Sequence, residues 1–153
     1  MKNMYLLNAF ICLLITVATH EGCNTAPPAP ASKSVTLETA VWQLTDILVD
    51  PVPMHLPDTL AVPITIKFSD GEIQGFGGCN GFGGNYTYLE DQLSVSDIMH
   101  TEMYCEGTSE WETLFLQRLD QSQTFQIIGE TLEIDCGDLG GLKFRLNWKK
   151  RKG

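Results

Sequence analysis

The sequence has few basic residues and few histidines. Lysine and arginine together number 10 against 19 aspartates and glutamates, and the net charge is −9. A general nucleic-acid-binding protein needs a basic face, so this balance argues against that class. The 3 histidines and 5 cysteines are too few for several metal sites or for a large redox system.

Motifs of common enzymes are also missing. The sequence contains no Gly-x-Ser-x-Gly nucleophile motif, no Gly-Lys-Ser/Thr phosphate loop and no Gly-x-Gly-x-x-Gly dinucleotide motif. His55 lies among prolines in a predicted loop and His100 on a predicted strand, and neither has an acid or a nucleophile beside it in a recognisable pattern. We therefore expect no catalytic residues, no metal site and no cofactor.

A packed core is nevertheless expected. Hydrophobic residues make up 43% of the 153 residues and charged residues 19%. This composition is too apolar for a disordered chain, and the length allows one domain plus targeting residues.

The first 22 residues are typical of a secretory signal peptide. Lys2 is followed by an uncharged, mostly apolar stretch from residue 4 to residue 19, which is shorter than the ~20 apolar residues of a transmembrane helix. Gly22-Cys23 then resembles a bacterial lipoprotein cleavage site, and a Pro/Ala/Ser-rich tether follows over residues 23–35. We expect Cys23 to carry lipid, which would anchor the protein to the membrane. The alternative is ordinary secretion with a free Cys23 thiol, because His20 and Glu21 replace the usual lipobox residues.

Alternating apolar residues predict strands through most of the body. Asp70-Gly71 predicts a tight hairpin that pairs Phe68 with Ile73 and Ile66 with Gly75. Further strands are expected from the stretches 35–44, 62–69, 86–89, 92–95, 98–104, 124–128, 131–135 and 142–146. The second predicted hairpin pairs Phe125 with Ile134 and Ile127 with Leu132. A proline-rich loop is expected around Pro51, Pro53 and Pro57.

Two other segments differ from this pattern. Six glycines between Gly75 and Gly84 predict a bulged, sharply turned crossing between two strands. Ser109-Glu110-Trp111-Glu112 is a capping-box sequence, and the apolar residues that follow predict an amphipathic helix over 110–119.

These elements predict an α+β fold. About seven or eight strands with short connections give a mostly antiparallel sheet, and a strongly curved, partly open barrel-like form hides its edges. One amphipathic helix packs its apolar face on this sheet. Lys149, Lys150, Arg151 and Lys152 form a basic tail over residues 149–153.

The order of several motifs resembles the META domain of HslJ-type heat-shock-associated bacterial lipoproteins. The motifs are Trp42-Gln-Leu, Gly77-Gly78-Cys79-Asn80, Gly84-Asn85-Tyr86, Thr101-Glu-Met103-Tyr104-Cys105, Phe115-Leu-Gln-Arg-Leu119 and Leu132-Glu-Ile134. The resemblance covers about residues 37–147, within a domain that we place at 36–148. It implies an exported, often lipidated protein without established enzymatic activity, loosely linked to envelope stress, and a fold similar to that of secretin pilot lipoproteins.

The family resemblance also identifies Cys79 and Cys105 as a cysteine pair. In an oxidising envelope the pair would form a disulfide, and the alternative is two buried reduced thiols. Cys136 is expected to be an unpaired thiol. Its presence nevertheless leaves open which two of the three cysteines form the disulfide. Met99, His100, Met103 and Cys105 carry soft ligands suited to Cu(I), but on a strand His100 would face away from the other three, which disfavours a site.

We therefore expect a monomeric, non-catalytic binding or maintenance protein of the bacterial envelope, facing the periplasm from the outer membrane or soluble in the periplasm. Its partner would be an envelope protein or an apolar ligand. Phe76, Phe82 and Tyr86 near the glycine crossing are the predicted contact surface. The alternative is a periplasmic metal carrier or an enzyme whose site the sequence does not reveal.

Overall fold

The computed structural model describes residues 35–38, 40–49, 52–58, 60 and 62–147. The elements in this part of the chain are β1 (Val41–Val49), β2 (Val52–His55), β3 (Thr65–Ser69), β4 (Glu72–Phe76), β5 (Gly81–Leu89), β6 (Gln92–His100), α1 (Ser109–Asp120), β7 (Thr124–Ile128), β8 (Thr131–Asp135), the 3-10 helix η1 (Gly137–Leu139) and β9 (Gly141–Asn147). The predicted signal peptide, Cys23, the tether up to residue 34 and the basic tail lie outside the described residues.

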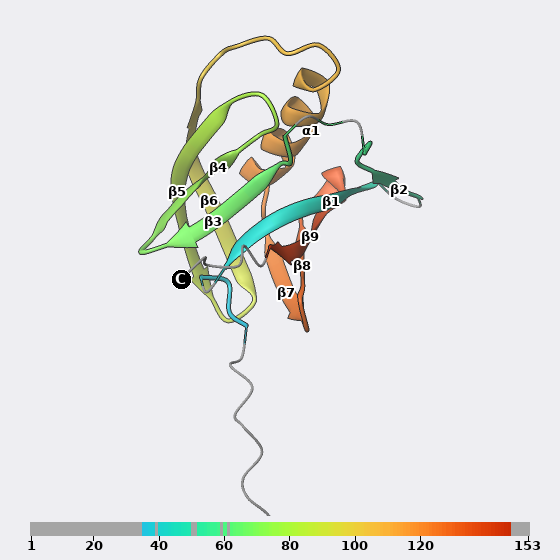
Figure 1. Ribbon diagram of the computed structural model, residues 1–153. Helices are drawn as coiled ribbons and strands as arrows, with labels where there is room; N and C mark the ends of the chain where they lie inside the picture. The colour runs from blue at the N-terminus through green and yellow to red at the C-terminus, as the bar shows by residue number, and fades with distance from the viewer. Residues whose placement is uncertain (1–34, 39, 50–51, 59, 61, 148–153) are drawn as a thin grey trace, which may run out of the picture. The chain divides into compact units, whose positions relative to one another are not determined.

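The strands form one antiparallel sheet that closes into a ring (Figure 1). Their order is β2-β1-β3-β4-β5-β6-β7-β8-β9, and β9 also pairs with β1. The junction between β6 and β7 is narrow, since the residue pair Gln92↔Thr124 alone defines its register in the described sheet. The predicted α+β class and the strongly curved antiparallel sheet are confirmed, with nine strands in the described residues instead of seven or eight.

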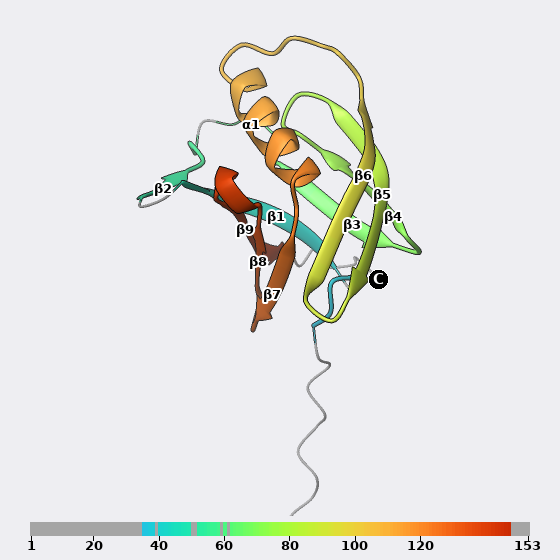
Figure 2. The same cartoon turned by 180° about the vertical axis from the view of Figure 1, so that it is seen from behind.

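Helix α1 lies over the region where β6 and β7 separate (Figure 2). The Phe115 ring projects from the helix into the core. Its centroid is 5.4 Å from that of Phe82 on β5 and 6.3 Å from that of Phe144 on β9. The helix thus connects, through side chains, two parts of the sheet that share few backbone hydrogen bonds.

The core follows from the alternation of apolar residues along the strands. Side chains at every second position of a strand lie on one face of the sheet, and here that face is the inner face of the ring. The fully buried large side chains are Trp42, Phe68, Phe115, Phe144, Ile47, Ile64, Ile66, Ile73, Leu119, Leu132, Ile134 and Leu142. The register of both predicted hairpins is confirmed.

The structure corrects the prediction for the first strand and the proline-rich loop. Val35 and Leu37 precede β1, which begins at Val41 and continues to Val49. The expected loop contains the strand β2, with Pro53 in its interior. A proline is tolerated there because β2 is the end strand in the order of the described sheet, where β1 is its one neighbouring strand among the described residues.

The strand predicted over residues 98–104 is too long. Strand β6 ends at His100, and residues 101–105 leave the sheet. The reason is a set of hydrogen bonds that join Thr101 and Met103 to the side chain of Asn80, which precedes β5. No helix within the described ranges is long and apolar enough to cross a membrane.

Candidate functional site

A glycine turn connects β4 to β5 and forms the base of the candidate site. The backbone N–H of Gly77 donates to the carbonyl of Asn80 at 2.8 Å, which closes the turn. Gly78 has φ of 100°, a conformation that glycine adopts without strain. A Cβ atom on Gly77 would lie 2.3 Å from Glu112 Oε1, so the helix packs directly against the bare backbone.

Asn80 ends this turn and is almost fully buried, with 2% of its surface exposed. Its Oδ1 accepts hydrogen bonds from Thr101 Oγ1 and from the backbone N–H of Met103, both at 2.8 Å. Its Nδ2 donates to the Met103 carbonyl at 2.9 Å. The Asn80 side chain therefore binds both backbone groups of Met103, as a neighbouring strand would do.

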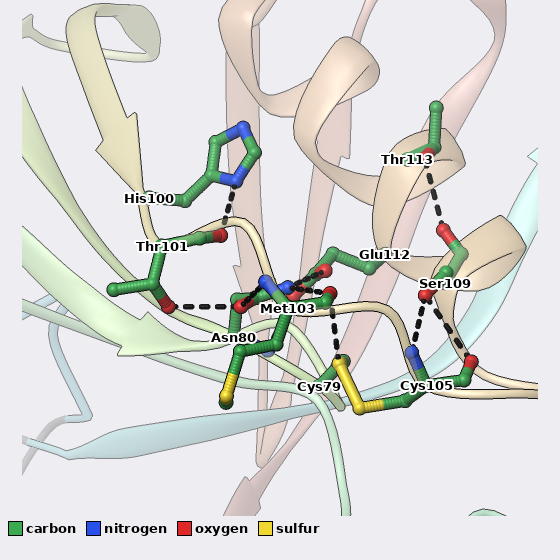
Figure 3. Close-up of a disulfide and its surroundings, with 9 residues drawn as sticks. All are labelled: Cys79, Asn80, His100, Thr101, Met103, Cys105, Ser109, Glu112 and Thr113. Atoms are coloured by element: carbon green, nitrogen blue, oxygen red, sulfur yellow. Dashed lines mark hydrogen bonds between the residues drawn. A yellow bond between two sulfur atoms is a disulfide. The ribbon is translucent and has the colours of Figure 1, made fainter.

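Glu112 holds Asn80 from the opposite side. This carboxylate lies in the first turn of α1 and is 5% exposed. Its Oε1 accepts from the Asn80 backbone N–H at 2.7 Å, and its Oε2 accepts from Asn80 Nδ2 at 2.6 Å. A negative charge in the first turn of a helix is also favoured by the helix dipole. Met103, Asn80 and Glu112 thus form a continuous, largely buried polar network (Figure 3).

The disulfide between Cys79 and Cys105 fastens the same region covalently (Figure 3). The predicted pairing is confirmed, and Cys136 is a free, buried thiol. On the helix side, Ser109 Oγ accepts from the Cys105 backbone N–H at 2.9 Å and lies 3.1 Å from the Cys105 carbonyl, to which its hydroxyl donates. We call residues 101–108 the disulfide loop, because they run from the end of β6 to the start of α1 and contain Cys105.

The disulfide loop presents large apolar side chains to solvent. Tyr104 is 82% exposed and Met103 is 62% exposed. Met99, at the end of β6 just before the loop, is 76% exposed. Burying such side chains is favourable, so a rigid backbone that keeps them in water is a feature typical of a contact surface.

The charged side chains within the disulfide loop and in the first turn of α1 are acidic, while Lys67 on β3 lines a surface hollow together with Thr101. Glu102 and Glu106 lie within the loop and are exposed, and Glu110 is exposed in the first turn of α1. Along the sequence, the 50 residues from Phe68 to Gln117 contain nine acidic residues and no lysine or arginine. The disulfide loop lies in this acidic half of the domain.

The predicted aromatic contact surface is corrected by the structure. Phe82 and Tyr86 are buried, at 6% and 4% exposure, and Phe76 is half-buried. Phe82 packs on Phe115, and the Tyr86 ring centroid lies 5.0 Å from that of Phe68. Phe82 and Tyr86 are core residues because the side chains at alternate positions of β5 point into the ring.

The capping box predicted for α1 is also wrong. The N-cap residue is Thr108, and its side chain makes no capping hydrogen bond. The Glu112 carboxylate binds Asn80 instead of the start of its own helix. Glu112 shares helical spacing with Phe115, Leu116 and Leu119, and this spacing, which the prediction did not use, is the signal that could have placed it on the buried face.

Of the four residues with soft ligands that could suit Cu(I), Cys105 is not free to bind a metal ion. The Cys105 sulfur is bonded to Cys79, so it offers no thiolate. His100 Nδ1 lies 2.9 Å from the Thr101 carbonyl, within hydrogen-bond distance. His55 lies on β2, where its Nδ1 contacts the Asp46 carboxylate. The described residues contain no group of three or more His, Cys, Asp or Glu side chains arranged to hold a metal ion.

The META domain family model matches residues 35–147, which is most of the chain. Among solved structures, one from Burkholderia xenovorans has a TM-score of 0.62 and 22% sequence identity, and the match covers 81% of this chain and 100% of that one. A DUF4847 family protein from Bacteroides vulgatus has a TM-score of 0.55 and 15% identity, with 72% and 94% covered. At these identities the structures show a common fold. No curated protein sequence matches the chain.

Proposed function

This chain belongs to the META domain family, and we propose that it is an exported, lipid-anchored and non-catalytic protein that binds a partner in the bacterial cell envelope. The contact surface is the disulfide loop. The observation that carries the proposal is the combination in that loop of a disulfide, a buried hydrogen-bond network and large exposed apolar side chains.

The disulfide supports export. Disulfides persist in oxidising compartments such as the bacterial periplasm and are rare in the cytosol. The bond between Cys79 and Cys105, which are 26 residues apart in the chain, joins the glycine turn to the disulfide loop. The sequence of residues 1–23 supports the same compartment, with Cys23 as the site of lipid attachment.

The polar network supports binding in preference to catalysis. Asn80 and Glu112 are buried polar side chains that bond to one another, and Asn80 also bonds to the disulfide loop. Asn80 bonds to the backbone of Met103, and Glu112 bonds to Asn80. Together they fix the backbone that carries the exposed side chains of Met103 and Tyr104. A loop that is ordered before binding loses less conformational entropy when a partner docks.

The anchoring part of the proposal is tested by mass spectrometry of the mature protein from membranes. We expect an N-terminus at Cys23 that carries a diacylglycerol and an amide-linked acyl chain. The Cys23→Ala variant should lose the modification and leave the membrane fraction. An N-terminus within or beyond the tether, or an unmodified Cys23, would contradict lipid anchoring.

The binding part is tested by a photo-crosslinking amino acid placed at Tyr104 in the full chain in its native envelope. The matched control position is Leu89, which is 76% exposed at the β5–β6 hairpin and lies outside the disulfide loop. We expect crosslinks to another molecule from position 104 and none above background from position 89. Equal yields at the two positions would contradict a specific contact surface.

A further inference from the structure

We infer that the partner of the disulfide loop is a protein segment in which an apolar side chain is flanked by lysines or arginines. This inference rests on the proposed function and specifies the chemistry of the partner. It follows from three observations on the described residues: which side chains the loop exposes, how firmly its backbone is held, and the sign of the charge around it.

The exposed side chains select an apolar group at the centre of the contact. Tyr104 and Met103 are adjacent, and both are more than three-fifths exposed. Tyrosine and methionine provide large contact areas, and the methionine thioether adapts to partners of different shape. An apolar or aromatic side chain of the partner would remove this area from water.

The backbone beneath these side chains is fixed at several points. Asn80 binds the N–H and the carbonyl of Met103, and Ser109 binds the N–H of Cys105. The Tyr104 backbone therefore lies between two residues that are both held in place. Because the ordering of the loop has already occurred, the contact needs little further loss of entropy.

The surrounding charge selects a basic partner. Glu102 and Glu106 flank Met103 and Tyr104 in the sequence, and Glu110 is exposed in the adjoining turn of α1, against one lysine, Lys67, that lines a hollow beside Thr101. Like charges across an interface are unfavourable, and opposite charges increase both the association rate and the specificity. For the same reason an anionic lipid surface is disfavoured as the occupant.

The test combines crosslinking from position 104 with charge reversal in the full chain in its native envelope. The crosslinked segments are identified by mass spectrometry, and we expect apolar residues with lysine or arginine on either side. Glu102→Lys with Glu106→Lys should lower the crosslink yield by about tenfold, because two favourable charge contacts become repulsive. The matched control is Glu72→Lys with Glu90→Lys, two exposed sites outside the loop with the same change of net charge. The control should keep the crosslink yield within about twofold of the wild-type yield, because salt screens the interaction of distant exposed charges with the contact surface.

The outcomes separate this inference from the proposed function. Crosslinks to acidic or uncharged segments, to lipid alone, or with equal sensitivity to both charge reversals would overturn the inference while the binding role stands. A lack of any crosslink from position 104, with the disulfide intact by peptide mapping, would overturn the binding role itself.

A second measurement uses defined probes. The full chain in non-ionic detergent is titrated with the peptide Lys-Lys-Trp-Lys-Lys and with its counterpart Glu-Glu-Trp-Glu-Glu, and the disulfide loop is followed by nuclear magnetic resonance. We expect shifts at residues 101–108 with the basic peptide alone, weakened by salt. Equal shifts with both peptides, or shifts confined to other parts of the sheet, would contradict a basic partner.

Discussion

Glu112 binds Asn80 through two separate donors, the backbone N–H at 2.7 Å and the side-chain amide at 2.6 Å. The two residues are 32 positions apart. Asn80 in turn holds Met103, so the position of an exposed loop depends on a buried carboxylate in the helix. The stability of the domain and the shape of its proposed contact surface are therefore coupled.

Replacing this carboxylate tests the coupling. In Glu112→Gln, an amide NH₂ group replaces one acceptor and faces a donor of Asn80. Hydrogen bonds to charged groups contribute about 1.5–3 kcal/mol, so we expect the free energy of unfolding to fall by about 2 kcal/mol. Urea denaturation measures the change. Glu110→Gln is the control, because Glu110 is exposed on the same helical turn and should change stability by less than about 0.5 kcal/mol. Equal losses would mean that the buried contact contributes nothing specific.

The disulfide should contribute to stability mainly by restricting the unfolded chain. For the 26-residue separation of Cys79 and Cys105, the chain-entropy relation gives about 3.5 kcal/mol. We expect the Cys79→Ala/Cys105→Ala double variant to lose about that amount in chemical denaturation, and the wild type to show the same loss under reducing conditions. A wild type whose midpoint does not respond to a reductant would contradict the assignment.

Two glycines of the crossing should respond differently to the same substitution. A Cβ atom at Gly75 would lie 2.0 Å from the Thr65 carbonyl oxygen and 2.7 Å from the Phe82 ring. At Gly83 the nearest atom would be the Ile73 carbonyl oxygen, at an ordinary 3.5 Å. We expect Gly75→Ala to lower the melting temperature sharply, with a loss of about 3 kcal/mol, and Gly83→Ala to be nearly neutral. Similar melting temperatures for the two variants would show that the strands adjust freely.

The Cys136 thiol should be chemically inert in the native protein. Burial, with a smaller contribution from the Asp135 charge, raises its pKa to about 12, although Arg118 acts in the opposite direction. The thiolate is the reactive form, so alkylation near pH 8 should be slow in the folded protein and fast in urea. Rapid native-state labelling, measured by intact mass, would mean that the side chain is accessible.

Stability should fall in strongly alkaline solution because of Tyr86. Burial, followed by the hydrogen bond that its hydroxyl donates to Glu38, raises the pKa of Tyr86 from 10.0 to about 12. The folded state thus holds this proton more tightly than the unfolded state. The resulting stabilisation is complete below pH 10 and is lost as the pH rises from about 10 to 12. Tyr86→Phe should flatten the pH dependence of unfolding in that window, and an unchanged slope would contradict the shift.

Local signals in the sequence predicted the hairpins correctly. Asp70-Gly71 has positive φ at both residues, as a tight hairpin turn requires, and the alternation of apolar residues on either side fixed the register. The helix was predictable for the same reason, since its apolar spacing is a property of a single segment. The cysteine pair came from the family resemblance.

Contacts between distant segments explain the errors. Residues 101–105 have strand-like composition, but the Asn80 side chain bonds to the Thr101 hydroxyl and to both backbone groups of Met103, where the chain leaves the sheet. Phe82 and Tyr86 are aromatic residues near glycines. They are buried because the sheet closes on itself through the pairing of β1 with β9. Neither effect leaves a pattern in the neighbouring sequence.

The pairing of β1 with β9 has a consequence for how the chain acquires its structure. Gln43 on β1 and Asn147 on β9 are 104 residues apart, and β9 pairs with β1 from Val41 to Leu48. Contacts of such long range slow folding, because bringing the ends of a long segment together costs conformational entropy before the contacts between them form. When the polypeptide emerges N-terminus first from a ribosome or a translocation channel, β1 can pair with β9 only after β9 has emerged. The domain therefore completes its fold only after nearly all of it has emerged, and partly emerged chains need protection from aggregation.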